Sequence, residues 1–101
     1  MRLLWTDRAR EDLLAIGHYI ARDKPGAARA WVDRLKKRAR QAASMPRAGR
    51  KLPELPRDDL REVIEHGYRI VYRILEAENQ IHVLTVFESH RLLRRLELDD
   101  P

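Results

Sequence analysis

The sequence predicts an α+β domain in which a helix hairpin packs on one face of a small, mainly antiparallel sheet. Apolar residues recur with helical spacing in the first half of the chain, a loop rich in proline follows, and three runs with strand alternation come next. A length of 101 residues, of which 44% are hydrophobic, fits one core between two layers. We therefore expect a single domain over residues 1–101.

The chain opens with a short apolar run, residues 2–5, which we interpret as a strand. Thr6 or Asp7 can cap the next helix, because a short side-chain oxygen accepts a hydrogen bond from a first-turn amide. That helix is predicted to end near Arg22 or Asp23. Its apolar stripe has spacings of 4, 3 and 4 and consists of Ala9, Leu13, Ile16 and Ile20.

A second helix follows an interruption of the pattern at residues 23–26, Asp-Lys-Pro-Gly. Pro25 is predicted to be its first residue, where the missing amide hydrogen costs nothing. Trp31 flanks the stripe and is expected to pack in or beside the core. Because residues 23–26 form so short a connection, the two helices are predicted to form an antiparallel hairpin. The stripe again has helical spacing and consists of Ala28, Val32, Leu35, Ala39 and Ala42.

Residues 45–57 hold three of the five prolines and are predicted to be a connector without regular structure. Within it, we expect Gly49 to permit a positive φ angle. Three strands are then predicted, near residues 60–65, 68–75 and 81–88. His66-Gly67 forms the first turn and residues 76–80 the second, so the strands make an antiparallel meander.

The two faces of this meander differ in what they are expected to contact. Tyr68, Ile70, Tyr72 and Ile74 alternate along one strand and are predicted to share the face that packs on the helices. The opposite face is predicted to be apolar as well, through Val71, Leu75, Leu84 and Val86. Surplus apolar surface indicates a cover, which is either the C-terminal stretch 92–98 or a partner chain. Arg69 and Arg73 are expected to pair with Glu62 or Glu65 across the hairpin.

Charge is distributed unevenly along the chain. The net charge is +5, with 14 Lys/Arg against 5 Asp/Glu in residues 1–51 and 7 against 11 in residues 52–101. Ten basic residues lie between Lys24 and Lys51. They form either a solvated face or a surface for phosphates or an acidic protein segment.

Several classes of site and location are disfavoured by the sequence. The chain has no cysteine, which excludes disulfides and thiolate metal sites and suits a reducing cytoplasm. The four histidines lack the helical spacing of a metal site, so we expect no metal and no cofactor. No signal peptide or membrane span is predicted. The expected location is the cytoplasm.

The order and spacing of several short motifs resemble the ParE/RelE superfamily of toxins from bacterial type II toxin–antitoxin systems, and most closely its ParE branch. The motifs are Asp12-Leu13 and Tyr19-Ile20, Gly49-Arg50 with Pro53-Glu54-Leu55, Leu60-Arg61-Glu62, the segment 68–73, and 81–87 followed by His90-Arg91. The resemblance covers nearly the whole chain. It implies a β-α-α-β-β-β order with a short C-terminal helix or tail. It also implies a ParD-like antitoxin that wraps and neutralises the toxin in a hetero-oligomer.

The resemblance leaves the target open, because ParE-like members are similar to inhibitors of DNA gyrase and RelE-like members to ribosome-dependent mRNA endonucleases. We favour gyrase inhibition, with no catalytic residue of the chain's own. In this interpretation the target contacts are Arg50, Arg91, Arg94 and Arg95, and the antitoxin contacts are Val71, Leu75, Leu84 and Val86.

A ribonuclease remains the main alternative. Cleavage through a 2′-hydroxyl requires a proton acceptor, a proton donor and cations that converge on the phosphate. Arg61, His90 and Arg91 are the candidates for these roles. No tyrosine follows Tyr72, so the late tyrosine of RelE-like nucleases has no match. A third alternative is a non-toxic corepressor that only binds the antitoxin.

Overall fold

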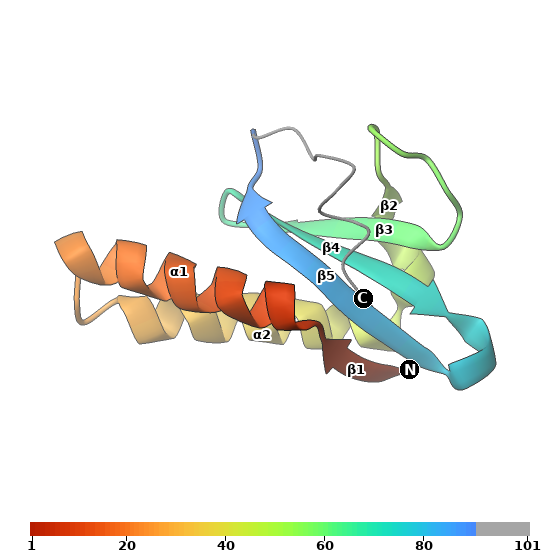
Figure 1. Cartoon of the computed structure of the whole chain (residues 1–101), viewed down its shortest axis with the longest axis horizontal. Coiled ribbons are helices and arrows are strands. Elements are labelled where there is room, and N and C mark those ends of the chain that lie inside the picture. The colour runs from red at the N-terminus through yellow and green to blue at the C-terminus, as the bar shows by residue number, and fades with distance from the viewer. Residues whose placement is uncertain (91–101) are drawn as a thin grey trace.

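The computed structural model describes residues 1–90, and its elements follow the predicted α+β order. The predicted C-terminal helix or tail lies outside the described residues. Residues 1–90 form two α-helices and a five-stranded sheet of order β1-β5-β4-β3-β2 (Figure 1). The elements are β1 (Arg2–Trp5), α1 (Asp7–Asp23), α2 (Ala28–Ser44), β2 (Arg50–Lys51), β3 (Leu60–Glu65), β4 (Tyr68–Leu75) and β5 (Gln80–Glu88).

The sheet is mixed because β1, which precedes the helix hairpin in the chain, runs parallel to its neighbour β5. β1 pairs with β5 in parallel, with Leu3 opposite Ile81, and the remaining pairs are antiparallel. The prediction that residues 45–57 lack regular structure is wrong for β2, which lies inside this connector and pairs Arg50 with Glu62 of β3. α1 and α2 lie side by side on one face (Figure 1). Within residues 1–90, neither helix is long and apolar enough to cross a membrane.

The main core lies between the helix hairpin and the sheet, as the stripes predict. α1 contributes Ala9, Leu13 and Ile16, and α2 contributes Leu35, Ala39 and Ala42. The small alanines let α2 approach the sheet closely, so larger side chains on the strands can fill the layer. The sheet residues of this core include Val63, Ile70, Tyr72, Ile74, Ile81, Val83 and Val86, with Tyr68 partly buried beside them.

The helix hairpin closes differently from the prediction. α2 begins at Ala28, so the prediction that Pro25 is the first residue of this helix is wrong. The amide of Ala27 donates to the carbonyl of Lys24 at 2.9 Å, which closes a turn over residues 24–27. Pro25 is the second residue of that turn, a position that suits its fixed φ angle.

The prediction that Val86 lies on the face away from the helices is also wrong. Val71 pairs with Thr85 and Tyr72 pairs with Val83, so Leu84 is an extra residue on β5. One extra residue reverses the alternation of the strand beyond it. Val86 therefore joins the helix-side core, and Phe87 turns to the opposite face.

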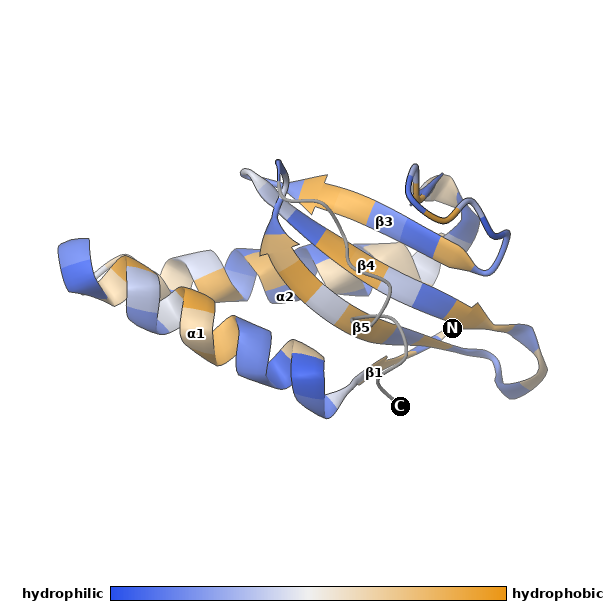
Figure 2. Cartoon of the chain, turned by 45° about the horizontal axis from the view of Figure 1, so that its top comes forward, coloured by the Kyte–Doolittle hydropathy of each residue, from blue (hydrophilic) through white to orange (hydrophobic). Residues whose placement is uncertain are grey.

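The opposite face is covered in part by the connector itself. Leu52, Leu60, Val71, Leu84 and Phe87 are buried together there, with Leu55 packed against them. The prediction of a second apolar face is thus confirmed for Val71 and Leu84, while Leu75 is half-buried. In Figure 2, apolar bands follow one another along much of β5, which agrees with burial of both faces of the sheet.

Glycine is required at two positions for different physical reasons, a positive φ angle at Gly67 and close packing at Gly49. Gly67 has φ +85° and follows His66 at φ +47°, which confirms the predicted tight turn. Gly49 has φ −67°, so the expected positive φ is wrong. A Cβ on Gly49 would lie 2.3 Å from Tyr72 Oη and 3.0 Å from the carbonyl of Glu62. Close packing of the connector against β3 and β4 is therefore the reason for this glycine.

The hydroxyl of Thr6 joins the first helix to the sheet. It accepts from the amide of Ala9 at 3.1 Å, which confirms the predicted cap, and lies 3.0 Å from the carbonyl of Val83 and 3.1 Å from that of Leu84. We expect Thr6→Ala to lower the free energy of unfolding by about 1–2 kcal/mol, and Thr6→Ser to retain most of it. Urea denaturation measures both, and equal losses in the two variants would contradict a role for the hydroxyl.

Candidate functional site

The candidate site lies on the sheet face away from the helices, where Arg69 of β4 is buried with a side chain only 4% exposed. Its Nε donates to Glu62 Oε1 at 2.6 Å, and its two terminal nitrogens donate to the Glu54 carboxylate at 2.6 and 2.7 Å. The guanidinium carbon also lies 5.0 Å from the centre of the Phe87 ring. This arrangement confirms the predicted pairing of Arg69 with Glu62 and adds Glu54. The same prediction is wrong for Arg73, whose Nε lies 3.8 Å from Asp59 Oδ2.

This ion network connects three segments of the chain. Glu54 belongs to the connector, Glu62 to β3 and Arg69 to β4, and Arg50 of β2 donates through Nε to the second oxygen of Glu62. Hydrogen bonding to Glu54 raises the pKa of Arg69 above its ordinary value, more than burial lowers it. The positive charge of Arg69 is therefore already balanced by two carboxylates.

Arg61, a candidate catalytic cation, braces the connector. Its Nε donates to the carbonyl of Asp58, and one terminal nitrogen donates to the carbonyls of Arg47 and Gly49 at 3.1 and 3.0 Å. The other terminal nitrogen donates to Asp58 Oδ1 at 2.9 Å. Four hydrogen bonds within the domain leave this side chain 11% exposed. The structure thus gives Arg61 a defined role in shaping the loop.

Asp58 is the acidic centre of a second, exposed ion cluster. Arg47 donates to Asp58 at 2.6 Å and to Glu76 at 3.0 Å. The hydrogen bond and charge of Arg47 hold the pKa of Asp58 below its ordinary value. This cluster ties the start of the connector to the turn after β4.

His90, the candidate acid or base, lies at the end of the described chain. Its side chain is 81% exposed, and its Nε2 lies 3.0 Å from Glu88 Oε2. It borders an open cleft of about 600 Å³ between α1 and β5, which also contains Asp12, Tyr19, Tyr68 and Glu88. No arginine or lysine is among the described residues that line this cleft. Arg61 lies near the connector, so the structure does not bring it together with His90 in this cleft.

The residues predicted to contact the target or the antitoxin differ in exposure, and some of them lie outside residues 1–90. Arg50 is exposed beside the ion network. Arg91, Arg94 and Arg95 lie outside the described residues. Among the predicted antitoxin contacts, Val71, Leu84 and Val86 are buried and Leu75 is half-buried.

Sequence reasoning missed two features of the domain. The Asp12 carboxylate accepts from Thr85 Oγ1 at 2.6 Å and from the amide of Val86 at 3.0 Å. Both donors lie on β5, just past the last residue that pairs with β1. An apolar cleft also opens between α1 and α2 near Trp5. The only signal for it in the sequence is Leu14, an apolar residue off the predicted stripe that is 64% exposed. Within residues 1–90, no three acidic or histidine side chains are placed to hold a metal ion.

Comparison with known proteins agrees with this architecture. A family model described as the ParE toxin of the type II toxin–antitoxin system parDE matches residues 3–93. Toxin RelE2 of Caulobacter vibrioides is 36% identical over 92 residues, which cover 90% of this chain and 98% of that protein.

Solved structures show the same fold. The chromosomal ParDE toxin–antitoxin system of P. aeruginosa has a TM-score of 0.71 at 25% identity, over 87% of this chain and 95% of that one. The isolated E. coli RelE toxin has a TM-score of 0.62 at 23% identity, over 90% and 86% of the two chains.

The helix hairpin, the mixed sheet and the connector over its second face define the class as a toxin fold of type II toxin–antitoxin systems. The chain belongs to the ParE toxin family, within the ParE/RelE superfamily.

Proposed function

We propose that this toxin acts in the cytoplasm by inhibiting DNA gyrase, and that a ParD-like antitoxin neutralises it. The observation that supports gyrase inhibition over RNA cleavage is the pairing of the cations on the second sheet face. Arg69 is balanced by Glu54 and Glu62, and Arg61 is engaged by the connector. A phosphodiester needs unbalanced positive charge at the reacting group.

The distribution of acid and base groups supports the same proposal. A nuclease brings an acid, a base and cations into one concavity. Here His90 borders a cleft whose described charged residues are Asp12 and Glu88, and no arginine or lysine is among its described lining residues. Inhibition through protein contact requires no such convergence.

An antitoxin partner is supported by the kinds of complex that share the fold. The similar structures include the ParDE system of P. aeruginosa and the RelBE complex of E. coli, the second a likeness at 23% identity that concerns the fold alone. The basic face of α2, on a chain of net charge +5, suits an acidic protein segment.

Ribosome-dependent mRNA cleavage is the second candidate function, because the similar C. vibrioides protein is named Toxin RelE2. In that case His90 would transfer protons and arginines of residues 91–95 would supply charge. The two candidates differ in what the purified protein does to supercoiled DNA and to mRNA.

Two assays run with the same purified protein separate these functions. We expect loss of gyrase supercoiling activity, or trapped cleaved DNA, while mRNA on programmed ribosomes stays intact. His90→Ala is expected to leave the gyrase result unchanged, as is the matched control His18→Ala on α1. Cuts in ribosome-bound mRNA that His90→Ala abolishes and His18→Ala does not would establish the nuclease instead. Inactivity in both assays would support the non-toxic corepressor.

A further inference from the structure

The outer surface of α2 carries positive charge that no carboxylate of residues 1–90 neutralises. Arg34, Lys37 and Arg40 are exposed and follow one another at three-residue spacing, so they form a row on one side of the helix. Arg29 is also exposed and lies about three turns before Arg40 on the same side. We call these four residues the α2 basic face. The only acid in α2 is Asp33.

The arginines of the connector and of the strands that follow contrast with this face, because all of them are paired. Each arginine from Arg47 to Arg73 has a carboxylate oxygen within 3.8 Å. No residue of the α2 basic face has a carboxylate partner among residues 1–90. The guanidinium of Arg34 lies 5.5 Å from the centre of the Trp31 ring, a contact that leaves its charge unbalanced. The charge of this face is therefore available to an external anion.

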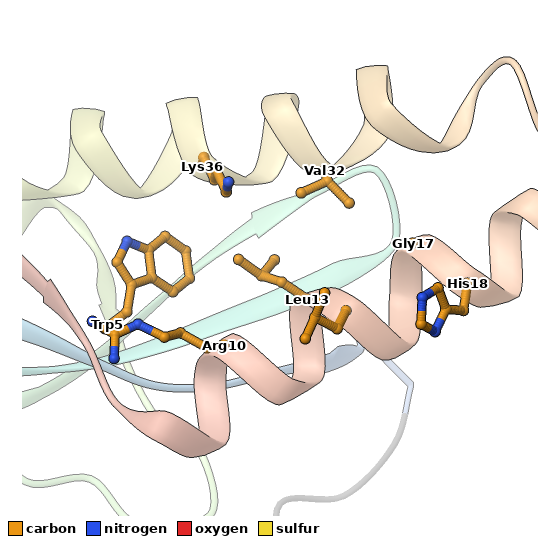
Figure 3. Close-up of a pocket in the computed structure, with 8 residues that line it drawn as sticks. Trp5, Arg10, Leu13, Gly17, His18, Val32 and Lys36 are labelled. Carbon is orange, nitrogen blue, oxygen red and sulfur yellow. The ribbon is translucent and has the colours of Figure 1, made fainter.

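The α2 basic face is separate from the other charged and hollow surfaces of the domain. Figure 3 shows Val32 and Lys36 on the side of α2 that faces α1, where both border the cleft between the helices. None of the four residues of the face lines that cleft. The ion network of Arg69 lies on the opposite face of the sheet from the helices. The balanced and the unbalanced cations thus occupy different sides of the domain.

The residues around these cations indicate the kind of anion that fits them. Charge alone attracts an acidic protein segment as well as a nucleic acid, but the centre of a protein interface also buries apolar and aromatic side chains. None of the large apolar residues exposed in the described chain belongs to α2; they are Leu14, Tyr19, Met45 and Ile64. An antitoxin segment attracted by this charge must find its apolar contacts outside the face. A phosphate backbone requires only cations and polar donors.

We propose that the α2 basic face binds the phosphate backbone of duplex DNA without regard to sequence. Single-stranded RNA fits less well, because its bases stack on exposed aromatic rings and Trp31 is half-buried beneath Arg34. About 16 Å of helical rise separates Arg29 from Arg40, which exceeds the roughly 12 Å width of the major groove, so the face can reach phosphates of both strands. The choice of DNA over duplex RNA rests on the proposed function, since gyrase acts on duplex DNA.

Fluorescence anisotropy with a short labelled DNA duplex of arbitrary sequence tests the inference. We expect the purified chain to bind this duplex with an affinity that falls as salt rises, with a logarithmic slope of about −3 to −4 for four phosphate contacts. Arg40→Gln and Lys37→Gln are each expected to weaken binding several-fold and to reduce the magnitude of the slope by about 1. Asp33→Asn is expected to strengthen binding, because it removes the one charge on α2 that repels phosphate.

The matched control is Arg57→Gln, which removes the same charge from an exposed arginine of the connector. Arg57 is paired with Asp59 and lies outside α2, so affinity and slope are expected to stay close to those of the wild type. Thermal unfolding checks that every variant keeps the fold. Equal weakening by Arg40→Gln and Arg57→Gln would show that net charge, and not the α2 basic face, attracts DNA, and would overturn the inference.

Two further results would also contradict it. One is the absence of DNA binding by the wild type at about 50 mM salt, where phosphate contacts are strong. The other is tighter binding of duplex RNA or of polyglutamate than of DNA, which would assign the face to another ligand. Failure of the proposed function is distinguishable, because these measurements need no gyrase. A chain that binds DNA through this face and leaves gyrase supercoiling intact supports the inference and contradicts gyrase inhibition.

Discussion

Replacing Arg69 with methionine is expected to lower the free energy of unfolding by about 3 kcal/mol or more, because removal of one partner of a buried ion pair leaves its acids uncompensated. Glu62 has a fully buried side chain and keeps only Arg50, while Glu54 loses both of its hydrogen bonds to Arg69. Urea denaturation measures the loss, provided that the dependence of the unfolding free energy on urea concentration is the same in both proteins.

Two comparisons establish whether the loss belongs to the network. Arg57→Met removes an exposed arginine paired with Asp59 and is expected to cost less than about 1 kcal/mol. Adding Glu54→Met to Arg69→Met is expected to restore part of the stability, since the carboxylate that lost its two hydrogen bonds to Arg69 is then gone. If Arg69→Met costs no more than Arg57→Met, the network does not hold the connector on the sheet.

Substitution of Gly49 by alanine is expected to lower the free energy of unfolding by about 2–3 kcal/mol through overpacking. The added carbon would lie 2.3 Å from Tyr72 Oη and 3.0 Å from the Glu62 carbonyl, and neither atom is free to move. Tyr72 is fully buried, and its hydroxyl donates to the carbonyl of Pro46 at 2.5 Å. Glu62 belongs to a paired strand. Thermal and urea unfolding provide the measurement.

The chain supplies a control at another glycine. A Cβ on Gly26 would have nothing within 4 Å, so Gly26→Ala is expected to change stability little. In a Tyr72→Phe background the nearest clashing atom is absent, and Gly49→Ala is expected to cost clearly less than in the wild type. An equal cost in both backgrounds would mean that the backbone contact with Glu62, and not the tyrosine, decides the penalty.

The elements whose signal is local were predicted well. The stripe from Ala9 to Ile20 and the cap at Thr6 place α1 within a residue of where it lies. The alternation from Tyr68 to Ile74 places β4 and the face that meets the helices. These patterns depend on neighbours a few positions away, so a single sequence contains them.

The errors arose where pairing with a distant segment decides the outcome. The extra residue Leu84 cannot be recognised from β5 alone, since a bulge is defined by the partner strand. For Gly49, the deciding atom is Tyr72 Oη, which is 23 positions further along the chain. Arg61 was considered as a catalytic cation because the sequence does not reveal that carbonyls of Arg47 and Gly49 would occupy it.

The sequence by itself determined the α+β class, the helix hairpin, the meander of three strands and the resemblance to type II toxins, because periodicity and motif order are properties of the chain. Only the tertiary structure decided the charge balance around Arg69, the burial of Val71 and Leu84 beneath the connector, and the cleft between α1 and α2. Those features depend on which distant side chains meet. In the folded state, burial and hydrogen bonding then determine how the charged groups among them behave.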